Sequence, residues 1–275
     1  MRIRRKCLDM ETKGCNVKHP TVSIIMPAYN AQGFIEETIS SVIAQTYADW
    51  ELLVIDDCSS DSTYETVRDI AKRESRIKLI KNEKNMGVAD TRNRGFALCS
   101  GKYVALLDSD DIWFADKLER QIALAEETGA DIIYCSYKMV DENGRAICDD
   151  FIVSEATNFE RCLSCSEISC STAFLSRQIT DKYRFNKDYY HEDLVLWLQL
   201  LRDGYTARGV TDVLVAYRLL DSGRSSKKTR SALNRWRVYR KYLKLPLFKS
   251  IKCITKYALL GVKKYQKHKK PKQQC

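Results

Sequence analysis

The sequence predicts an α/β fold with a mostly parallel central sheet, helices on both faces of that sheet, and basic helices at the C-terminal end. The first observation behind this prediction is an alternation of short apolar runs with amphipathic segments between Thr21 and Ile133. This order is typical of parallel strands joined by crossover helices. The second observation is a change of composition, because residues 222–275 contain 18 Lys and Arg but no Asp or Glu. Residues 1–221 contain 28 basic and 36 acidic side chains, so an acidic body carries a strongly basic tail.

Each expected strand is a short apolar run rich in β-branched or aromatic side chains, and each expected helix has apolar positions three and four residues apart. The second helix opens with the capping-box sequence Ser62-Thr63-Tyr64-Glu65, and Gly129 follows the fourth. The expected strands are Val22–Met26, Glu51–Ile55, Ile77–Ile80, Tyr103–Leu107 and Ile132–Tyr137, and the expected helices are Phe34–Gln45, Ser62–Glu74, Val88–Cys99 and Lys117–Thr128.

The second half of the chain has a less regular pattern. We expect extended or loop structure over Arg145–Thr157 and a polar loop over Cys162–Ser171. A helix is expected over Leu194–Arg202, with Gly204 as its stop, and an extended segment over Tyr205–Tyr217. The domain prediction is an α/β domain over residues 20–225 and a basic amphipathic helical tail over residues 226–275.

Polar residues follow three of the expected strands at the point where each strand ends. They are Pro27-Ala28-Tyr29-Asn30, Asp56-Asp57 and Asp108-Ser109-Asp110-Asp111. Because the carboxyl ends of parallel strands share one edge of a sheet, we expect these residues to line one cleft. Turn formation and helix capping are the alternative explanation, and they account best for Asp61 and Ser62.

The acidic cluster after the fourth strand predicts a divalent metal that holds a phosphorylated substrate. Carboxylates suit Mg²⁺ and Mn²⁺, and those cations in turn bind phosphates. The chain contains neither the G-x-G-x-x-G pattern after its first strand nor the G-x-x-x-x-G-K-[ST] pattern anywhere. The phosphates are therefore not expected to be held in the Rossmann or P-loop manner.

Four motifs occur in order along the chain: VSIIMPAYN at 22–30, VIDDCSSDS at 54–62, NMG at 85–87 with RNRG at 92–95, and LDSDD at 107–111. Together they resemble the motifs of family 2 glycosyltransferases with the GT-A fold, which build bacterial capsules, O-antigens and teichuronic-type polymers. The resemblance covers about residues 20–225. It implies a metal-dependent, inverting transfer of a sugar from a nucleotide-sugar, commonly UDP-linked, to an acceptor hydroxyl.

The resemblance also implies roles for individual residues. The nucleobase and ribose would be held by the residues after the first two strands, with Arg92 reaching the diphosphate or the sugar. Asp108 would face the ribose or the metal, and Asp110 would bind Mn²⁺ or Mg²⁺. The donor-binding residues implied in this way are Pro27, Ala28, Tyr29, Asn30, Asp56, Asp57, Arg92, Asp108 and Ser109.

A base is expected at the start of the Leu194–Arg202 helix. The attacking hydroxyl must lose its proton as it bonds, which requires a positioned carboxylate. His191-Glu192-Asp193 resembles the acidic pair that precedes a Trp-bearing helix in the family. The resemblance implies that Asp193 is the base and that Glu192 and Trp197 shape the acceptor site. Two alternatives stay open: acidic residues favoured by the helix dipole alone, and His191 as the base.

The chain departs from the family pattern after Tyr217-Arg218, where a His is often found and none is present here. This departure leaves Arg218, Ser222 and Arg224 as candidates to contact the diphosphate, and it leaves the third metal ligand open. The Ser169–Thr172 loop falls where relatives approach the acceptor, and a plain surface loop is the alternative.

The tail has apolar positions three or four residues apart, interrupted near Pro246, with Lys and Arg around them. The apolar positions are Trp236, Tyr239, Leu243, Leu247, Ile251, Ile254 and Ala258. A basic amphipathic helix is typical of a segment that binds an anionic membrane surface. The alternative is that the apolar face packs on the catalytic domain. Nucleic acid is not expected as a partner.

The expected partners are a nucleotide-sugar and a carbohydrate or lipid-linked acceptor, and the expected location is the cytoplasmic face of the plasma membrane. Eleven scattered cysteines, an odd number, favour reduced thiols. No signal peptide or membrane-spanning run is recognised. Two rival functions remain at this point. One is a Mg²⁺-dependent phosphotransferase that uses Asp108 and Asp110, and the other is a non-catalytic scaffold bound through its tail.

Overall fold

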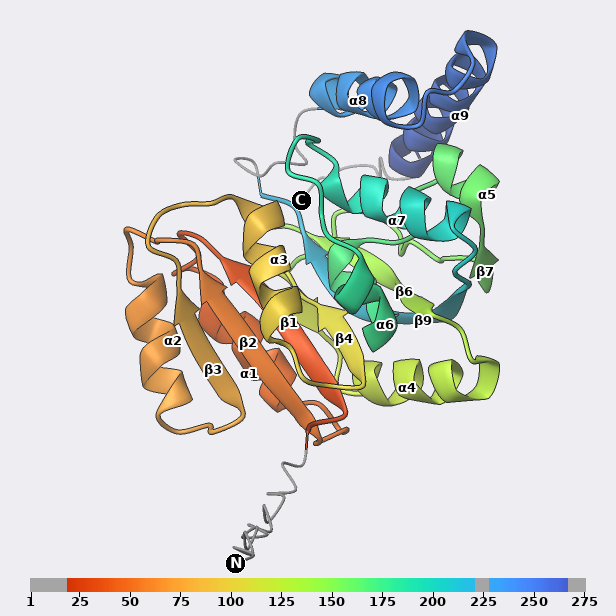
Figure 1. The fold of residues 1–275 in the computed structure, drawn as a ribbon. Helices are drawn as coiled ribbons and strands as arrows, with labels where there is room; N and C mark the ends of the chain where they lie inside the picture. Colours follow the sequence, from red (N-terminus) through yellow and green to blue (C-terminus); the bar gives the residue numbers. More distant parts are fainter. Residues whose placement is uncertain (1–18, 221–227, 267–275) are drawn as a thin grey trace, which may run out of the picture.

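A mixed nine-stranded sheet forms the centre of the protein (Figure 1). The computed structural model describes residues 19–220 and 228–266 of the 275-residue chain. The strands follow the order β3-β2-β1-β4-β8-β6-β9-β5, and β7 pairs with β9. Their bounds are β1 Val22–Ala28, β2 Trp50–Asp56, β3 Ile77–Lys81, β4 Tyr103–Leu106, β5 Ile112–Trp113, β6 Ile132–Val140, β7 Ala156–Thr157, β8 Phe174–Ser176 and β9 Ala207–Arg218.

The first four strands form the parallel half of the sheet. β1 pairs in parallel with both β2 and β4, and β2 pairs in parallel with β3. In this register Ala28 lies opposite Asp56, and Ile25 lies opposite Leu106, so the three strands end at one edge. The polar residues that follow them therefore meet at that edge, as predicted.

The second half of the sheet is mixed. The short strand β8 lies between β4 and β6 and runs antiparallel to both. β9 runs parallel to β6 but antiparallel to β5 and β7. The first four strands are therefore parallel throughout, whereas the second half combines the parallel pair β6–β9 with antiparallel pairs. β8 was not predicted because three residues are too few to give a periodic signal.

Helices cover both faces of the sheet, as predicted. α1 (Ile35–Ile43), α2 (Thr63–Ala71) and α4 (Lys117–Thr128) contribute to one apolar core. α3 (Val88–Leu98), α5 (Phe159–Ser164), α6 (Arg177–Lys182) and α7 (Glu192–Arg202) contribute to the other. Alternation along each strand supplies both cores, since successive side chains point to opposite faces. In β1, for example, Ile24 and Met26 enter the first core and Ile25 enters the second.

Two local expectations are wrong. Ser62 makes no side-chain cap for α2; instead, the Asp61 carboxylate accepts hydrogen bonds from Thr63 N at 3.0 Å and Thr63 Oγ1 at 2.5 Å. The segment expected as the polar loop Cys162–Ser171 is partly helical, because it contains the end of α5 and the 3₁₀ turn η1 (Cys170–Thr172). Cys162 and Leu163 are buried there, so tertiary packing overrides the polar composition of the segment.

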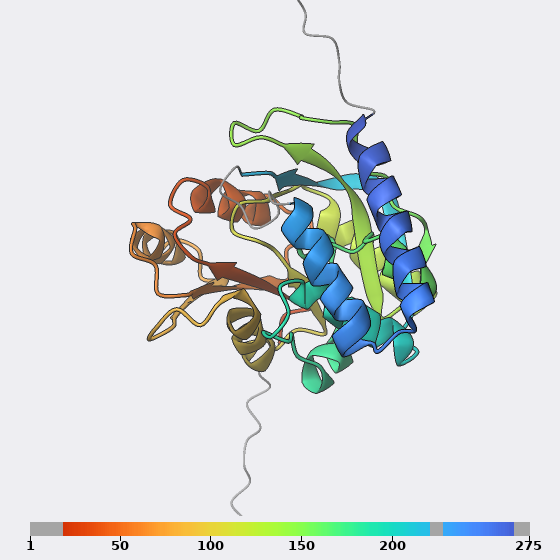
Figure 2. The same cartoon turned by 90° about the horizontal axis from the view of Figure 1, so that it is seen from above.

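The tail forms two helices that lie beside α5 and α7 (Figures 1 and 2). α8 (Lys228–Arg237) continues into the π-helical turn η3 (Val238–Tyr242), and α9 (Leu247–Gln266) begins after Pro246. Because proline interrupts a helix, the predicted break at this residue is confirmed. Val238 and Tyr239 are buried in the second core, and Tyr242 Oη donates to Gln199 Oε1 on α7 at 2.8 Å. The inner side of the tail therefore packs on the rest of the protein.

The predicted apolar face of the tail is only partly covered by the domain along α9. Leu247 and Ile251, both expected on that face, are exposed, whereas Ser250 and Cys253 are buried. α9 therefore presents one apolar row to the domain and a second apolar row to solvent. Among the helices in residues 19–220 and 228–266, none is long and apolar enough to cross a membrane.

Candidate active site

A cavity of about 1410 Å³ opens at the carboxyl edge of the parallel strands. One side is formed by the residues after β1 and β2 together with the start of α3. The other side is formed by residues 164–170, the start of α7 and the tail helices. Asp108, Ser109 and Asp110, directly after β4, lie between the two sides.

The turn after β1 is held in a defined shape. Asn30 has a positive φ of 49°, its N–H donates to Ser59 Oγ at 3.0 Å, and its Oδ1 accepts from Ser60 N at 2.9 Å. Tyr29, by contrast, is 52% exposed. All four predicted residues, Pro27 to Asn30, line the cavity. The turn therefore presents the exposed ring of Tyr29 on a backbone that is held by hydrogen bonds.

The two aspartates after β2 occupy different environments. Asp57 lines the cavity and accepts hydrogen bonds from Asn82 Nδ2 at 2.7 Å and from the N–H groups of Met86 and Gly87 at 2.8 Å each. Its carboxylate therefore fixes the segment that leads into α3. Asp56 is fully buried and is not one of the residues lining the cavity. Its Oδ1 has no hydrogen-bond partner within the described residues.

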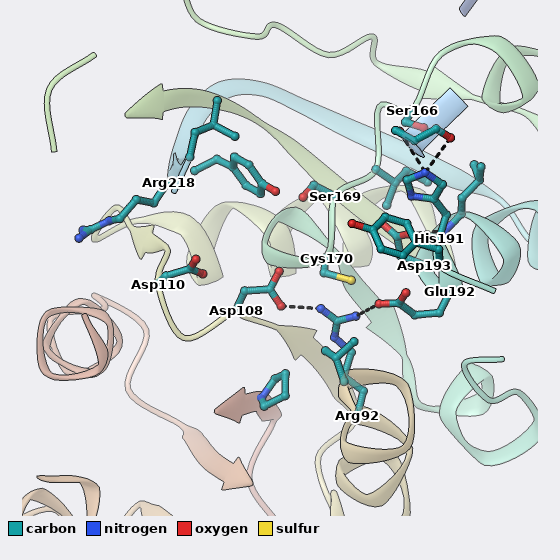
Figure 3. Close-up of a pocket in the computed structure, with 18 of the residues that line it drawn as sticks. Arg92, Asp108, Asp110, Ser166, Ser169, Cys170, His191, Glu192, Asp193 and Arg218 are labelled. Atoms are coloured by element: carbon teal, nitrogen blue, oxygen red, sulfur yellow. Dashed lines mark hydrogen bonds and ion pairs between the residues drawn. The ribbon is translucent and has the colours of Figure 1, made fainter. Parts of the chain in front are cut away.

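Arg92 joins the two sides of the cavity (Figure 3). Its guanidinium donates to Asp108 Oδ1 at 2.5 Å and to Glu192 Oε1 at 2.9 Å. Arg92 is only 4% exposed, so water screens these ion pairs weakly. The carboxylate at the end of β4 and the carboxylate at the start of α7 are thus held by one cation from α3.

Asp110 and Asp111 differ in what their carboxylates contact. Burial and the nearby charge of Asp108 raise the pKa of Asp110 to about 6, and no ion pair reaches Asp110 within residues 19–220 and 228–266. Asp111 is fully enclosed and accepts from Ser171 Oγ and from Arg218 N at 2.8 Å. Burial, followed by the charges of Asp110 and Asp108, also raises the pKa of Asp111. Crowded carboxylates of this kind favour a cation.

Asp108 and Asp110 therefore fit a divalent cation better than Asp111 does. Both line the cavity with carboxylate oxygens, the ligand type that Mg²⁺ and Mn²⁺ prefer. No third His, Cys, Asp or Glu completes a metal-binding group with them in the described part of the chain. Arg218, just before the segment where a His is often found in the family, pairs with Glu37 Oε2 at 2.7 Å and lies over the Phe34 ring. Ser222 and Arg224 lie outside the described residues.

The start of α7 brings the expected base to the cavity. Asp193 lines the cavity and is half-buried, and its Oδ1 accepts from Leu194 N at 2.7 Å. The neighbouring Glu192 is buried and engaged by Arg92. Trp197 is 1% exposed and is not among the residues that line the cavity, so it is placed in the core against Phe185 rather than at the expected acceptor site. At the position of Trp197, one turn after Asp193, α7 has entered the apolar core.

Comparison with known proteins decides the family. The sequence profile described as Glycosyl transferase family 2 matches residues 23–184, more than half of the chain. The chain belongs to glycosyl transferase family 2. It is 38% identical over 246 residues to WfgD of Escherichia coli, a UDP-Glc:alpha-D-GlcNAc-diphosphoundecaprenol beta-1,3-glucosyltransferase, and the match covers 89% of this chain and 94% of WfgD. It is also 36% identical over 246 residues to TuaG of Bacillus subtilis (strain 168), provisionally named as a teichuronic acid biosynthesis glycosyltransferase. That match covers 89% of this chain and 97% of TuaG.

Solved structures support the same fold for this family 2 glycosyltransferase. S. aureus TarS 1–349 in complex with UDP-GlcNAc superposes with a TM-score of 0.70 at 20% identity, covering 88% of this chain and 73% of that chain. The mannosyltransferase PcManGT from Pyrobaculum calidifontis, in complex with GDP-Man and Mn²⁺, gives a TM-score of 0.66 at 20% identity. The superposition covers 89% of this chain and 70% of the PcManGT chain. The predicted GT-A fold and glycosyltransferase activity are confirmed, which removes the phosphotransferase and scaffold alternatives.

The contacts between the Ser169–Thr172 turn and the acidic cluster of this glycosyltransferase site were not predicted. Ser171 Oγ accepts from Asp108 N at 3.1 Å and donates to Asp111, while Trp113 Nε1 donates to Ser171 O at 2.9 Å. The Ser169–Thr172 turn therefore supports the acidic cluster, in addition to placing Ser169 and Cys170 in the wall of the cavity.

The tail also contributes to the wall of the cavity, through Ser231, Arg235, Tyr257 and Leu260. His191 Nε2 lies 3.0 Å from Ser231 Oγ and 3.2 Å from Ser231 O, so the histidine that preceded the expected base is engaged by α8. No local pattern could indicate these contacts, because each joins segments that are distant in sequence.

Proposed function

We propose that this glycosyltransferase moves a sugar from a UDP-sugar to an acceptor hydroxyl, with inversion at the transferred carbon, during the synthesis of a cell-surface polysaccharide. The observation that carries the proposal is the placement of Asp193 in the same cavity as Asp108 and Asp110. A donor bound after β1, β2 and β4 would present its sugar to the α7 side, where the base lies. The names of WfgD and TuaG support the polysaccharide role, and the TarS complex with UDP-GlcNAc supports a UDP-sugar donor.

The nucleoside would occupy the donor side of the cavity. Tyr29 supplies an exposed ring for a base to contact, and the rigid turn at Asn30 keeps that ring in place. Asp57 holds the backbone of Met86 and Gly87 at the cavity wall. Asp56 is buried and its Oδ1 has no partner in the part of the chain that the structure describes, so a small shift would bring this carboxylate to a nucleoside N–H or ribose hydroxyl.

Asp110 and Asp108 would hold Mn²⁺ or Mg²⁺ at the diphosphate. Bound there, a divalent cation stabilises the negative charge of the departing diphosphate. Arg92 keeps Asp108 in position through their 2.5 Å ion pair. Arg218 is buried near Asp110 and its Nε has no partner among the described residues, so it is the side-chain cation that would compensate diphosphate charge.

Asp193 would remove the proton of the attacking hydroxyl. Arg92 holds Glu192 at 2.9 Å, and Ser231 holds His191. Of these three neighbouring candidates, Asp193 is therefore the one whose side chain is best placed to act as a base in the cavity. A base on the side opposite the diphosphate directs attack from the face away from the leaving group. Inversion follows from that geometry.

The tail would hold the enzyme on the anionic inner face of the plasma membrane. Phe248, Ile251 and Leu259 of α9 are 82%, 48% and 61% exposed, and Lys252 and Lys256 are exposed beside them. Exposed apolar side chains next to lysines are the combination that binds anionic lipid. A lipid-linked acceptor, as in the name of WfgD, would be met at that surface.

Vesicle flotation tests the membrane proposal. We expect the protein to float with vesicles that contain about one third phosphatidylglycerol, more weakly in high salt because charge attraction is screened. Phe248→Ser with Leu259→Ser should abolish flotation, whereas Leu98→Ser, a 48% exposed control at the end of α3, should not. Equal flotation of the double variant and the control would contradict the proposal.

A thermal-shift measurement with UDP, with and without Mn²⁺, tests the donor and metal proposals. We expect UDP with Mn²⁺ to raise the melting temperature by several degrees, since ligand at 100 times its Kd contributes about 2.7 kcal/mol. Asp110→Asn should remove the metal-dependent part of the shift, and Glu65→Gln, an exposed control on α2, should keep it. A thermal shift with GDP but not with UDP would mean that the donor is a GDP-sugar and would leave the transfer reaction in place. The absence of any shift with either nucleotide would overturn the proposal.

A further inference from the structure

We propose that the cavity has an exit for an apolar chain attached to the acceptor, formed by Ile152 after β6 and Leu260 on α9. This inference rests on the proposed transfer reaction and goes beyond it by placing the non-reacting part of the acceptor. Ile152 is 58% exposed and Leu260 is 37% exposed, yet both line the same cavity as Asp193. Exposed large apolar side chains at the rim of a ligand cavity are suited to contact the apolar part of a ligand.

The exit lies on the acceptor side of the cavity. The donor is placed after β1, β2 and β4, whereas Asp193 belongs to α7. Because the base must contact the attacking hydroxyl, the acceptor enters from the α7 side. The wall beyond Asp193 is formed by residues 164–170, the tail and the segment after β6. An acceptor whose hydroxyl reaches Asp193 must therefore extend along these elements.

The tail forms a fixed part of that wall. Arg235 is 3% exposed and donates to Cys162 O at 2.9 Å, to Leu163 O at 3.0 Å and to Ser166 Oγ at 2.8 Å. Its guanidinium also lies 4.2 Å from the centre of the Tyr257 ring, which places α9. Ordered contacts of this kind hold Leu260, one turn beyond Tyr257, at the mouth of the cavity.

The chemistry along the wall changes from polar to apolar toward the exit. Near the base, Ser231 Oγ lies 3.0 Å from His191 Nε2 and 3.3 Å from Tyr257 Oη, so hydroxyl groups suited to a sugar lie there. At the mouth, Ile152 and Leu260 replace them.

The occupant we assign to the exit is the hydrocarbon chain of a lipid-linked saccharide. The exit is continuous with the exposed apolar side chains of α9, Phe248, Ile251 and Leu259, since Leu259 is next to Leu260 and is 61% exposed. A chain that leaves between Ile152 and Leu260 would reach the same surface that we propose contacts the membrane. A soluble saccharide without such a chain would leave these two side chains without a role.

Binding of methyl and n-decyl β-D-glucopyranoside to the full-length protein tests the exit. Both probes share a sugar and lack charge, and saturating UDP with Mn²⁺ fills the donor side. We expect the decyl probe, used below its micelle concentration, to bind at least about tenfold tighter, a gain that burial of roughly two methylene groups supplies. Ile152→Asp and Leu260→Asp should each remove most of that gain while leaving the affinity for UDP unchanged.

Phe248→Asp is the matched control, because Phe248 is exposed on α9 but does not line the cavity. It should keep the tenfold preference for the decyl probe. Equal binding of the two probes to the unaltered protein would overturn the exit, and so would a Phe248→Asp variant that loses the preference as completely as Leu260→Asp. Because UDP affinity is measured separately, failure of the exit is distinguishable from failure of the proposed donor site.

Discussion

At the scale of single residues, Arg92 contributes most to the architecture of the site. One guanidinium from α3 contacts Asp108 at 2.5 Å and Glu192 at 2.9 Å, at a position that is 4% exposed. Without Arg92, two carboxylates would face each other across the cavity with no cation between them, which is costly in a buried site. The ion pairs therefore fix the distance between the acidic cluster and the start of α7, and with it the placement of Asp193.

Asp193→Asn tests the assignment of the base. An amide cannot accept the proton, so we expect the transfer rate to fall about 10²- to 10⁴-fold while the affinity for UDP stays unchanged. Initial rates and UDP titration measure the two effects. If Asp193 serves only the helix dipole, the variant would instead keep its turnover and lose about 0.5 kcal/mol of stability. Asp188→Asn, at an exposed position before α7, is the control.

Lys117→Met tests the energetic cost of a buried ammonium group. Burial lowers the pKa of Lys117 to about 8, and its Nζ contacts Gln121 Oε1 at 2.6 Å and the Trp113 ring at 3.8 Å. Between pH 8 and about 10.4, the unfolded chain holds this proton and the folded protein does not, so the free energy of unfolding rises with pH.

We therefore expect the unaltered protein to gain about 2 kcal/mol over Lys117→Met between pH 7.5 and pH 9.5, as measured by urea unfolding. The exposed control Lys84→Met should show no such difference from the unaltered protein. Parallel pH profiles for the protein and Lys117→Met would contradict the prediction. The effect matters for the site because Gln121 Nε2 also donates to Thr172 O at 2.8 Å, within the turn that supports Asp108.

At the scale of elements, the position of α3 depends on close packing against β1. A Cβ added to Gly95 would collide with the side chain of Ile25, which comes from the fully buried interior of β1. Arg92 lies on the same helix, one turn before Gly95. The glycine therefore allows α3 to approach the sheet closely enough for Arg92 to reach both carboxylates.

Gly95→Ala should destabilise the protein even though alanine is the better helix former. Overpacking costs about 1–3 kcal/mol, which exceeds the gain of about 1 kcal/mol in helix propensity. Chemical denaturation measures the free energy of unfolding, and transfer activity should fall as well because Arg92 moves with the helix. Gly33→Ala, where an added Cβ meets nothing within 4 Å, is the control and should leave both unchanged.

At the scale of the whole molecule, the tail and the α/β domain share one core. Val238, Tyr239 and Cys253 of the tail belong to the same apolar cluster as Leu163 of α5 and Leu194 of α7. A basic segment with no acidic residue is thus attached by apolar packing and by the hydrogen bonds of Arg235 rather than by charge alone. The outer lysines remain available to an anionic surface.

Calorimetry tests this shared core. We expect a single unfolding transition whose calorimetric and van't Hoff enthalpies agree, because the two parts bury each other's apolar surface. Tyr239→Ala should lower the temperature of that whole transition, since it removes a fully buried ring at a cost of about 3–5 kcal/mol. Leu233→Ala, at a 68% exposed position on α8, should not. A separate, earlier transition for the tail would contradict the prediction.

The sequence by itself determined the parallel half of the sheet, the helices around it and the polar residues at its edge. Val22–Met26, Tyr103–Leu107 and Lys117–Thr128 were predicted nearly to their bounds, because apolar periodicity and Gly129 are local signals. Asp108 and Asp110 were predicted at the cleft for a similar reason: parallel strands end at one edge, so position along a strand indicates position in space.

Only the tertiary structure decided how distant segments meet. It placed Glu192 against Arg92, His191 against Ser231, and the tail against α5 and α7. It also buried Trp197, which was expected at the acceptor site, and left Leu247 of the tail exposed to solvent. Periodicity states that a helix has an apolar face, but which face is covered depends on the surface that the rest of the chain presents. That surface exists only after folding, because ion pairs and packing between remote segments leave no pattern in either segment alone.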